Sequence, residues 1–275
     1  MHDDQSQITR RDRYTHGYSE SVLRSHATRS AATCFAYGLP HLRPDMTILD
    51  VGCGPGTITA DIARLVAPGR AIGVDLEPAV LDQARQHAAE LGVTNIDFQL
   101  GDGYALDFPD ESFDLTHAHM VLHHVTDPVA VLAEMRRVTR PGGIVAAREP
   151  DIPIITWYPE NPGLDEWRRL FAESIRANGS EPASGRHLLA WAHQAGLTDV
   201  TASSSNWTYA AGESADWLSQ SWADRMLHSD MADQLVEEGL ATREDLQSVA
   251  RAWIDWAQHP DAWMIMPGAE ILAVR

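Results

Sequence analysis

A glycine-rich turn between an apolar run and a helical pattern constrains the fold more than any other stretch. Residues 46–51 are mostly apolar and predict a buried parallel strand, and glycines follow at positions 52, 54 and 56. Residues 57–66 then repeat apolar side chains at helical spacing. A strand, a glycine turn and a helix start form a nucleotide-binding crossover. Glycines let the backbone approach a ligand, and the helix start offers free N–H groups.

The glycine spacing distinguishes this turn from the dinucleotide fingerprint. That fingerprint is G-x-G-x-x-G, whereas Gly52, Gly54 and Gly56 give G-x-G-x-G. Asp50 precedes the turn, where a carboxylate repels a pyrophosphate but attracts an ammonium group. The pattern therefore disfavours a nicotinamide oxidoreductase, which shares the first crossover. A purely structural turn remains the alternative interpretation of the glycines alone.

Composition excludes several classes of partner. The formal net charge of −18 argues against a nucleic-acid backbone or an anionic membrane surface. All basic residues are arginine, so no lysine Schiff base or P-loop lysine can take part. Cys34 and Cys53 form neither a disulfide framework nor a metal pattern. No apolar run is long enough to span a bilayer. We therefore expect a cytoplasmic protein without membrane insertion or a nucleic-acid partner.

Strand and helix patterns alternate after the first crossover. Strands are predicted at 71–75, 96–100 and 144–147, and helices at 77–91 and 130–139. A further strand follows from the segment 108–115. Alternation of this kind implies a parallel, doubly wound sheet.

The second half of the chain predicts more helix. Residues 157–178 and 184–196 are predicted as helices, and 199–209 as a sixth strand. Residues 262–274, interrupted by Pro-Gly, are predicted as a seventh strand or a hairpin. The intervening segment 213–259 is helical. All nine tryptophans follow residue 150, which concentrates aromatic surface in this half.

Five motifs occur in order within residues 43–151: LDVGCGPG, GVDLEP, GDG, FPDESFDLTHAHMVLHHV and LAEMRRVTRPGG. Together they resemble the class I S-adenosylmethionine (SAM) dependent methyltransferases, in the ubiquinone/menaquinone-biosynthesis-like small-molecule group. The resemblance implies SAM as methyl donor, S-adenosyl-L-homocysteine as product and no metal.

The expected fold is α/β: a Rossmann-like, doubly wound, mostly parallel seven-stranded sheet. N-terminal helices (1–42) would form a lid and 43–151 the SAM-binding core. The region 152–275 would complete the sheet and carry a helical substrate cap, about 213–259, inserted between the last two strands.

The resemblance also implies the cofactor contacts. Asp50 and the glycines would hold the methionine moiety, Asp75 the ribose hydroxyls and Asp102 the adenine amino group. The full set implied for the cofactor is Tyr14, Asp50, Gly52, Cys53, Gly54, Gly56, Asp75, Leu76, Gly101, Asp102, Gly103 and His119.

The acceptor is less constrained by sequence. Transfer from a sulfonium is an in-line displacement that needs alignment and desolvation, so no protein nucleophile is obligatory. A base is required only for a hydroxyl or an acidic carbon. The catalytic candidates are His16, His123 and Glu149, and the candidates for substrate contact are Tyr18, Arg148, Trp157 and Trp222. Helix capping (His16) and core packing (His123 and the tryptophans) are the structural alternatives.

The sequence thus predicts a SAM-dependent methyltransferase acting on a small, apolar or aromatic metabolite at oxygen, nitrogen or carbon. One alternative is a quinone-type C-methyltransferase. Another is a non-catalytic SAM-binding or sensor protein, in which the tryptophan-rich insertion serves as an interaction surface. A homodimer is a further expectation.

Overall fold

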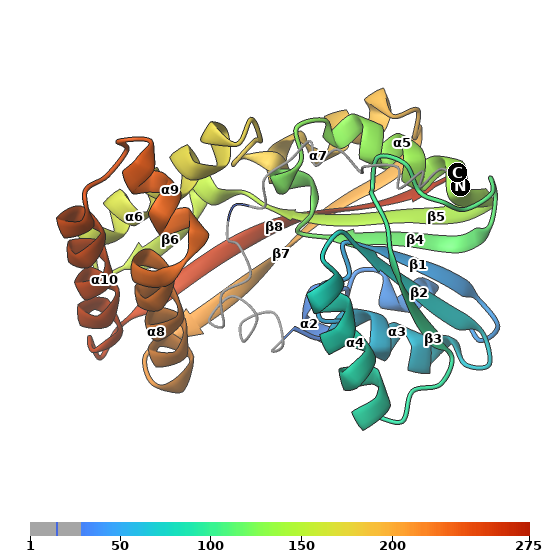
Figure 1. The fold of residues 1–275 in the computed structure, drawn as a ribbon, viewed down its shortest axis with the longest axis horizontal. Coiled ribbons are helices and arrows are strands. Elements are labelled where there is room, and N and C mark those ends of the chain that lie inside the picture. The colour runs from blue at the N-terminus through green and yellow to red at the C-terminus, as the bar shows by residue number, and fades with distance from the viewer. Residues whose placement is uncertain (1–14, 16–28) are drawn as a thin grey trace, which may run out of the picture.

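One twisted sheet runs through both halves of the chain (Figure 1). The computed structural model describes Thr15 and residues 29–275. Within that part the sheet has eight strands in the order β3-β2-β1-β4-β5-β8-β6, and β7 pairs with the other edge of β8. The strands are β1 Thr47–Val51, β2 Arg70–Asp75, β3 Ile96–Leu100, β4 Phe113–His119, β5 Thr139–Pro150, β6 Thr156–Tyr158, β7 Asp199–Ala210 and β8 Trp263–Val274.

The expected fold class is confirmed. Strands β1 to β5 pair in parallel, whereas β8 runs antiparallel to β5, β6 and β7. The sheet has one strand more than the seven expected, because β6 occupies the start of the segment predicted as helix from residue 157. Pro159 holds the preceding residue extended, and helix α6 (Pro162–Ala177) begins only after Asn161 caps it.

Strand β8 is continuous despite its Pro-Gly pair, so the strand interpretation was right and the hairpin wrong. On one side β8 pairs with β6 up to Ile265 and with β5 from Gly268 onward. Pro267 falls in the gap between these two neighbours. Its missing N–H therefore costs no ladder hydrogen bond on that side.

Helices cover both faces of the parallel half of the sheet (Figure 1). On one face lie α2 (Ala31–Cys34), α3 (Thr57–Val66) and α4 (Pro78–Glu90), and on the other α5 (Pro128–Val138) and α7 (Ser184–Gln194). Ile62 on α3 and Leu132 on α5 are fully buried in separate apolar clusters. The doubly wound arrangement follows from these two apolar faces. Three short 3-10 helices complete the described elements: η1 Leu39–His41, η2 Leu122–His124 and η3 Ile152–Ile154.

The helical insertion forms a second core at the far end of β7 and β8 (Figure 1). It contains α8 (Glu213–His228), α9 (Asp230–Glu237) and α10 (Arg243–Ala257), which pack with α6. The cap signal at residue 242 is confirmed, since the Thr242 hydroxyl accepts from the backbone N–H of Asp245. The centre of this core is aromatic: Trp167 lies 4.7 Å from the ring centres of both Trp222 and Trp253.

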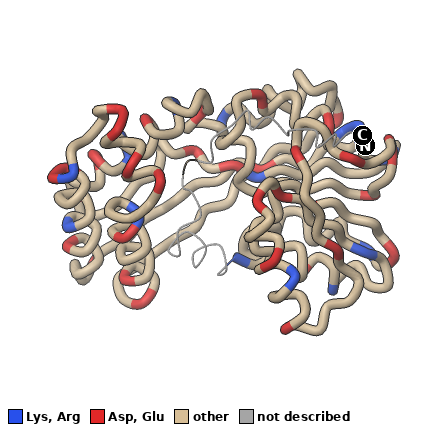
Figure 2. The backbone as a smooth tube through the Cα atoms, viewed as in Figure 1, with Lys and Arg blue, Asp and Glu red and all other residues tan. Residues whose placement is uncertain are grey.

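Acidic residues are spread along the backbone of both the parallel half and the cap (Figure 2), in keeping with the net charge of −18. Among the described residues, no helix combines the length and apolar character needed to cross a membrane.

The aromatic centre of the cap should dominate its stability. Trp167→Ala removes a fully buried ring and should lower the free energy of unfolding by about 3–5 kcal/mol. The control Trp263→Ala, whose side chain is 43% exposed, should cost about 0.5 kcal/mol or less. Chemical denaturation measures both. Equal losses would show that the tryptophan cluster is not the core of the cap.

Candidate functional site

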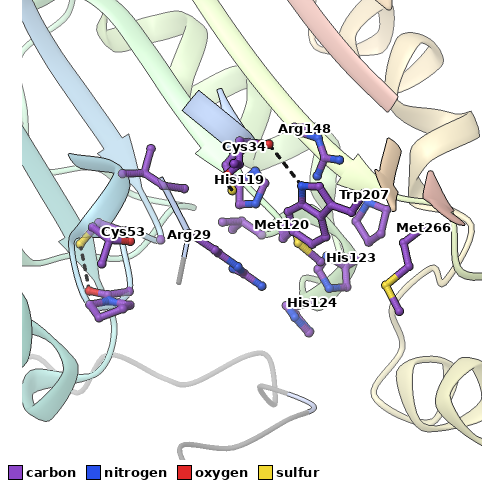
Figure 3. Close-up of a pocket in the computed structure, with 18 of the residues that line it drawn as sticks. Arg29, Cys34, Cys53, His119, Met120, His123, His124, Arg148, Trp207 and Met266 are labelled. Carbon is purple, nitrogen blue, oxygen red and sulfur yellow. Dashed lines mark hydrogen bonds between the residues drawn. The ribbon is translucent and has the colours of Figure 1, made fainter. Parts of the chain in front are cut away.

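A cavity of about 1600 Å³ lies between the carboxyl ends of the parallel strands and the cap. The glycine turn and the loops after β2, β3 and β4 form one end. Strand β7, helix α8 and the end of β5 form the opposite wall (Figure 3). In doubly wound sheets this edge is where ligands bind.

The glycine turn leaves room for a ligand. Gly54 has a φ of +53°, and a Cβ built there would meet no atom within 4 Å. A Cβ on Gly52 would instead lie 2.5 Å from a methyl of Val121. The Gly54 N–H donates to Asp75 Oδ2 over 3.0 Å, which fixes the turn to the end of β2. The backbone is thus close-packed on one side and open toward the cavity at Gly54.

Asp75 combines burial with spare acceptor capacity. Its Oδ1 accepts from the backbone N–H of Glu77 over 3.1 Å, and its Oδ2 accepts from Gly54. Burial raises the pKa of Asp75, and these amide donors oppose that rise. The two oxygens together have more lone pairs than these amide donors use, and the side chain lines the cavity. A pair of vicinal hydroxyls fits such an acceptor.

A two-residue clamp on α5 holds the next loop. Asp102 Oδ1 accepts from the backbone N–H of Tyr104 over 2.9 Å. The clamp itself consists of Glu134 and Arg137 on α5, which hold Leu106 in the same loop. The N–H of Leu106 donates to Glu134 Oε2 over 3.0 Å, and the Leu106 carbonyl accepts from Arg137 over 2.8 Å. Glu134 and Arg137 also pair with each other at 2.8 Å. The motif on α5 therefore positions the loop that carries Asp102.

Asp50 is engaged mainly by the protein. One carboxylate oxygen accepts from the Thr59 hydroxyl over 2.5 Å, and the other lies 2.8 Å from His117 Nδ1. The side chain is buried yet still contributes to the cavity wall. A ligand ammonium would have to share this carboxylate with two protein donors.

Glu149 ties the loop after β4 to the end of β5. Its Oε1 accepts from the backbone N–H groups of Val121 and Leu122, each over 2.8 Å. Its Oε2 accepts from the N–H of His123 over 3.2 Å and lies 2.7 Å from His123 Nδ1. Burial raises the pKa of Glu149 to about 7, although these amide donors oppose the rise.

The second ring nitrogen of His123, Nε2, is not paired with Glu149. Because the carboxylate of Glu149 only accepts, Nδ1 of His123 carries the proton and Nε2 holds a lone pair. Burial, followed by the charge of Arg29, lowers the pKa of His123 to about 3. Within the described part of the chain, Nε2 has no hydrogen-bond partner. The imidazole lines the cavity, and a proton received there would depend on the Glu149 carboxylate to offset the effect of burial.

The wall opposite the glycine turn is aromatic and contains arginine. Arg148 lies 4.6 Å from the centre of the Trp207 ring, and Arg225 lies 5.0 Å from that of Trp222. Tyr209 stacks on Trp217 at 6.4 Å. Sequence analysis missed most of these positions. The alternation along β7, which places residues 205, 207 and 209 on one face, was the available signal.

Most predicted site residues come together in this cavity, but several do not. Gly56 directly precedes α3 as its N-cap, and a Cβ there would lie 2.6 Å from Phe98, so it packs beneath the turn. Glu149 lies behind the loop that it holds, and Trp157 lies on β6 with Arg168 at 4.8 Å from its ring centre. Tyr14, His16 and Tyr18 lie outside the described residues. The predicted residues that line the cavity are Asp50, Gly52, Cys53, Gly54, Asp75, Leu76, Gly101, Asp102, Gly103, His119, His123, Arg148 and Trp222.

Metal ligands are not grouped in the part of the chain that the structure describes. No cluster there of three or more His, Cys, Asp or Glu side chains could hold a metal ion.

Comparison with known proteins agrees with this geometry. A family model described as a methyltransferase domain matches residues 42–210. An uncharacterized methyltransferase of Schizosaccharomyces pombe is 34% identical over 267 residues, covering 94% of this chain and 95% of that protein. A ubiquinone/menaquinone biosynthesis C-methyltransferase of Hahella chejuensis is 35% identical over 120 residues, covering 42% of this chain and 48% of that protein.

A solved structure supports the fold. The YcgJ protein of Bacillus subtilis superposes with a TM-score of 0.54 at 22% identity, covering 87% of this chain and 98% of that one. The family match and the full-length relative extend over the glycine turn and the strand ends described above. This chain therefore belongs to the SAM-dependent methyltransferases and is an enzyme of that class.

Proposed function

We propose that the enzyme transfers the methyl group of SAM to a small apolar or aromatic metabolite at a hydroxyl or an acidic carbon. The observation that carries this proposal is that one continuous cavity of about 1600 Å³ includes both the glycine turn and the aromatic wall. Pockets for one small ligand usually measure about 300–1000 Å³. The volume therefore suits two ligands side by side, with SAM at the end formed by Gly54, Asp75 and Asp102.

The far wall supports an apolar or aromatic acceptor. Trp207 and Tyr209 from β7, Trp222 from α8 and Met266 from β8 line it. Flat rings favour stacking with aromatic ligands, and the Met thioether adapts to their edges. The net charge of −18 disfavours nucleic acid as the acceptor.

The chemistry required of the protein is modest. Bound SAM supplies an electrophilic methyl group. The chain must align the acceptor, exclude water and receive the acceptor's proton where one is lost. The pairing of Glu149 with His123 supports the third task, because it leaves Nε2 as an acceptor on a residue that lines the cavity. A neutral amine would not need this base, so the pair favours oxygen or carbon.

The rival functions make different predictions. The similarity to the quinone C-methyltransferase covers 42% of this chain, so that acceptor is not carried over. A non-catalytic SAM-binding protein would bind SAM to saturation without releasing methyl groups.

Labelling tests the proposal. The purified protein is incubated with methyl-labelled SAM and fractionated host extract. Label in a small-molecule or organic-soluble fraction is expected. Label confined to protein or RNA would contradict a metabolite acceptor, and tight SAM binding with label in no fraction would favour the sensor alternative.

Asp75 should account for much of the SAM affinity. Asp75→Asn replaces an acceptor for the ribose hydroxyls by a partial donor, and should raise the Kd for SAM about 10-fold or more. The control Asp82→Asn alters an exposed carboxylate on α4 and should leave the Kd unchanged. Isothermal titration calorimetry measures both. An unchanged Kd in Asp75→Asn would remove this residue from the cofactor site.

The proposed base should give the reaction a defined pH dependence. Glu149, with a pKa raised to about 7, takes up a proton as the pH falls below that value. Once Glu149 is protonated, Nε2 of His123 carries a proton and can no longer act as the base. We therefore expect kcat to be full above about pH 7 and to fall below it. His123→Asn should lower kcat about 10²–10⁴-fold, whereas His193→Asn, exposed on α7, should not. A pH-independent kcat, or full activity of His123→Asn, would exclude this base.

A further inference from the structure

Among the residues that the structure describes, three arginines reach the acceptor end of the cavity from segments far apart in the chain. Arg29 precedes α2, Arg148 ends β5 and Arg225 lies on α8, and all three line the cavity. The chain has only 21 basic residues against 39 acidic ones, so this grouping runs against the composition. We call Arg29, Arg148 and Arg225 the arginine wall.

Indole rings hold the arginine wall in place. The guanidinium carbons of Arg29 and Arg148 lie 5.8 and 4.6 Å from the centre of the Trp207 ring. Arg225 lies 5.0 Å from that of Trp222. Figure 3 shows Arg148 beside Trp207, with the Arg29 side chain extending toward His124. Stacked guanidiniums are pre-organised, so little side-chain entropy is lost when they bind an anion.

The positive fields of the arginine wall converge. Tyr209 lines the same part of the cavity. Burial raises the pKa of Tyr209, and the guanidiniums of Arg29, Arg225 and Arg148 each lower it. One phenol thus lies within the fields of all three cations. The same three charges would attract an anionic group of a ligand that lies beside Tyr209.

Arg148 supplies an unused donor. It is 2% exposed, its Nε donates to the Ser205 hydroxyl over 3.2 Å, and it lies 3.4 Å from Glu270 Oε1. Nη2 has no hydrogen-bond partner among the described residues. A Cβ at Gly268 would lie 2.5 Å from this nitrogen, so glycine makes the space that the guanidinium fills. A buried donor without an acceptor is costly, so an acceptor supplied by a ligand in the cavity that Arg148 lines would be stabilising.

The carboxylate nearest to Arg148, that of Glu270, also has other hydrogen-bond partners. Glu270 accepts from the hydroxyls of Ser203 and Ser205 as well as facing Arg148. Glu213 and Asp230, at the starts of α8 and α9, also line the cavity. At the opposite end, the carboxylates are those of Asp50, Asp75, Glu77 and Asp102. Among the described residues, the arginines that line the cavity are all at the acceptor end, where they face Glu213 and Asp230, whereas the lining carboxylates at the cofactor end have no arginine beside them in the lining.

We propose that the methyl acceptor is itself an acid: an aromatic or apolar small molecule whose carboxylate binds the arginine wall. A guanidinium matches a carboxylate with two parallel hydrogen bonds, and the indoles suit the aromatic body. A sulfonium donor and a carboxylate acceptor also fit the placement of these arginines at the acceptor end. This inference rests on the proposed function and specifies its substrate class.

Depletion of the extract tests the acceptor directly. The low-molecular-mass fraction of the host extract is passed at pH 8 over an anion-exchange resin or, as the matched control, a cation-exchange resin. Anion exchange should remove the acceptor and abolish transfer of labelled methyl from SAM, and cation exchange should leave it. Full transfer after anion exchange would overturn the acidic acceptor while supporting methyl transfer. No transfer with untreated extract would instead count against the proposed function.

A binding pair tests the arginine wall without turnover. With the full chain saturated in S-adenosylhomocysteine, 2-naphthoate should bind about ten-fold tighter than its neutral analogue 2-naphthamide. Arg148→Gln should remove this preference and Arg148→Lys should retain part of it, with the affinity for S-adenosylhomocysteine reporting that each variant is folded. Equal binding of the two probes, or no binding of naphthoate at millimolar concentration, would overturn the proposal. So would an unchanged preference in Arg148→Gln.

Discussion

The arrangement of the site depends on one buried carboxylate. Glu149, fully buried at the end of β5, collects the backbone N–H groups of three consecutive residues after β4 together with the imidazole of His123. A buried charge is tolerated only when its hydrogen bonds are satisfied, and here four donors converge on it. The loop after β4, which lines the cavity, is therefore fixed to the sheet. The same contacts orient His123 toward the cavity.

Strand β8 is the second constraint, because it joins the two halves of the site. Its last residues pair with β5 and its first residues with β6, while β7 follows it along its whole length. The sheet thereby extends from the parallel core to the cap, and carries Trp207 and Tyr209 to positions opposite the glycine turn. The acceptor wall is thus an extension of the same sheet that binds the cofactor.

Local signals explain what could be predicted from the sequence. The helix expected at 57–66 and the strand at 96–100 have the predicted limits, since apolar periodicity and flanking glycines define them within one segment. The order of carboxylates after successive strands also placed Asp75 and Asp102 at one edge. What failed depends on tertiary contacts. Strand β6 exists because β8 offers an edge, and Trp157 on it faces Arg168 instead of the cavity. The grouping of Arg29, Arg148 and Arg225 has no signature within any one segment.

The most direct measurement of the central claim is a crystal structure of the ternary complex with S-adenosylhomocysteine and the acceptor isolated from the extract. We expect the cofactor between Gly54 and Asp75, and the accepting atom about 3–3.5 Å from the position of the transferable methyl. Nε2 of His123 should lie within hydrogen-bond distance of that atom, and the body of the acceptor against Trp207. An acceptor bound outside this cavity, or a cofactor that fills the space beside the arginine wall, would contradict the account.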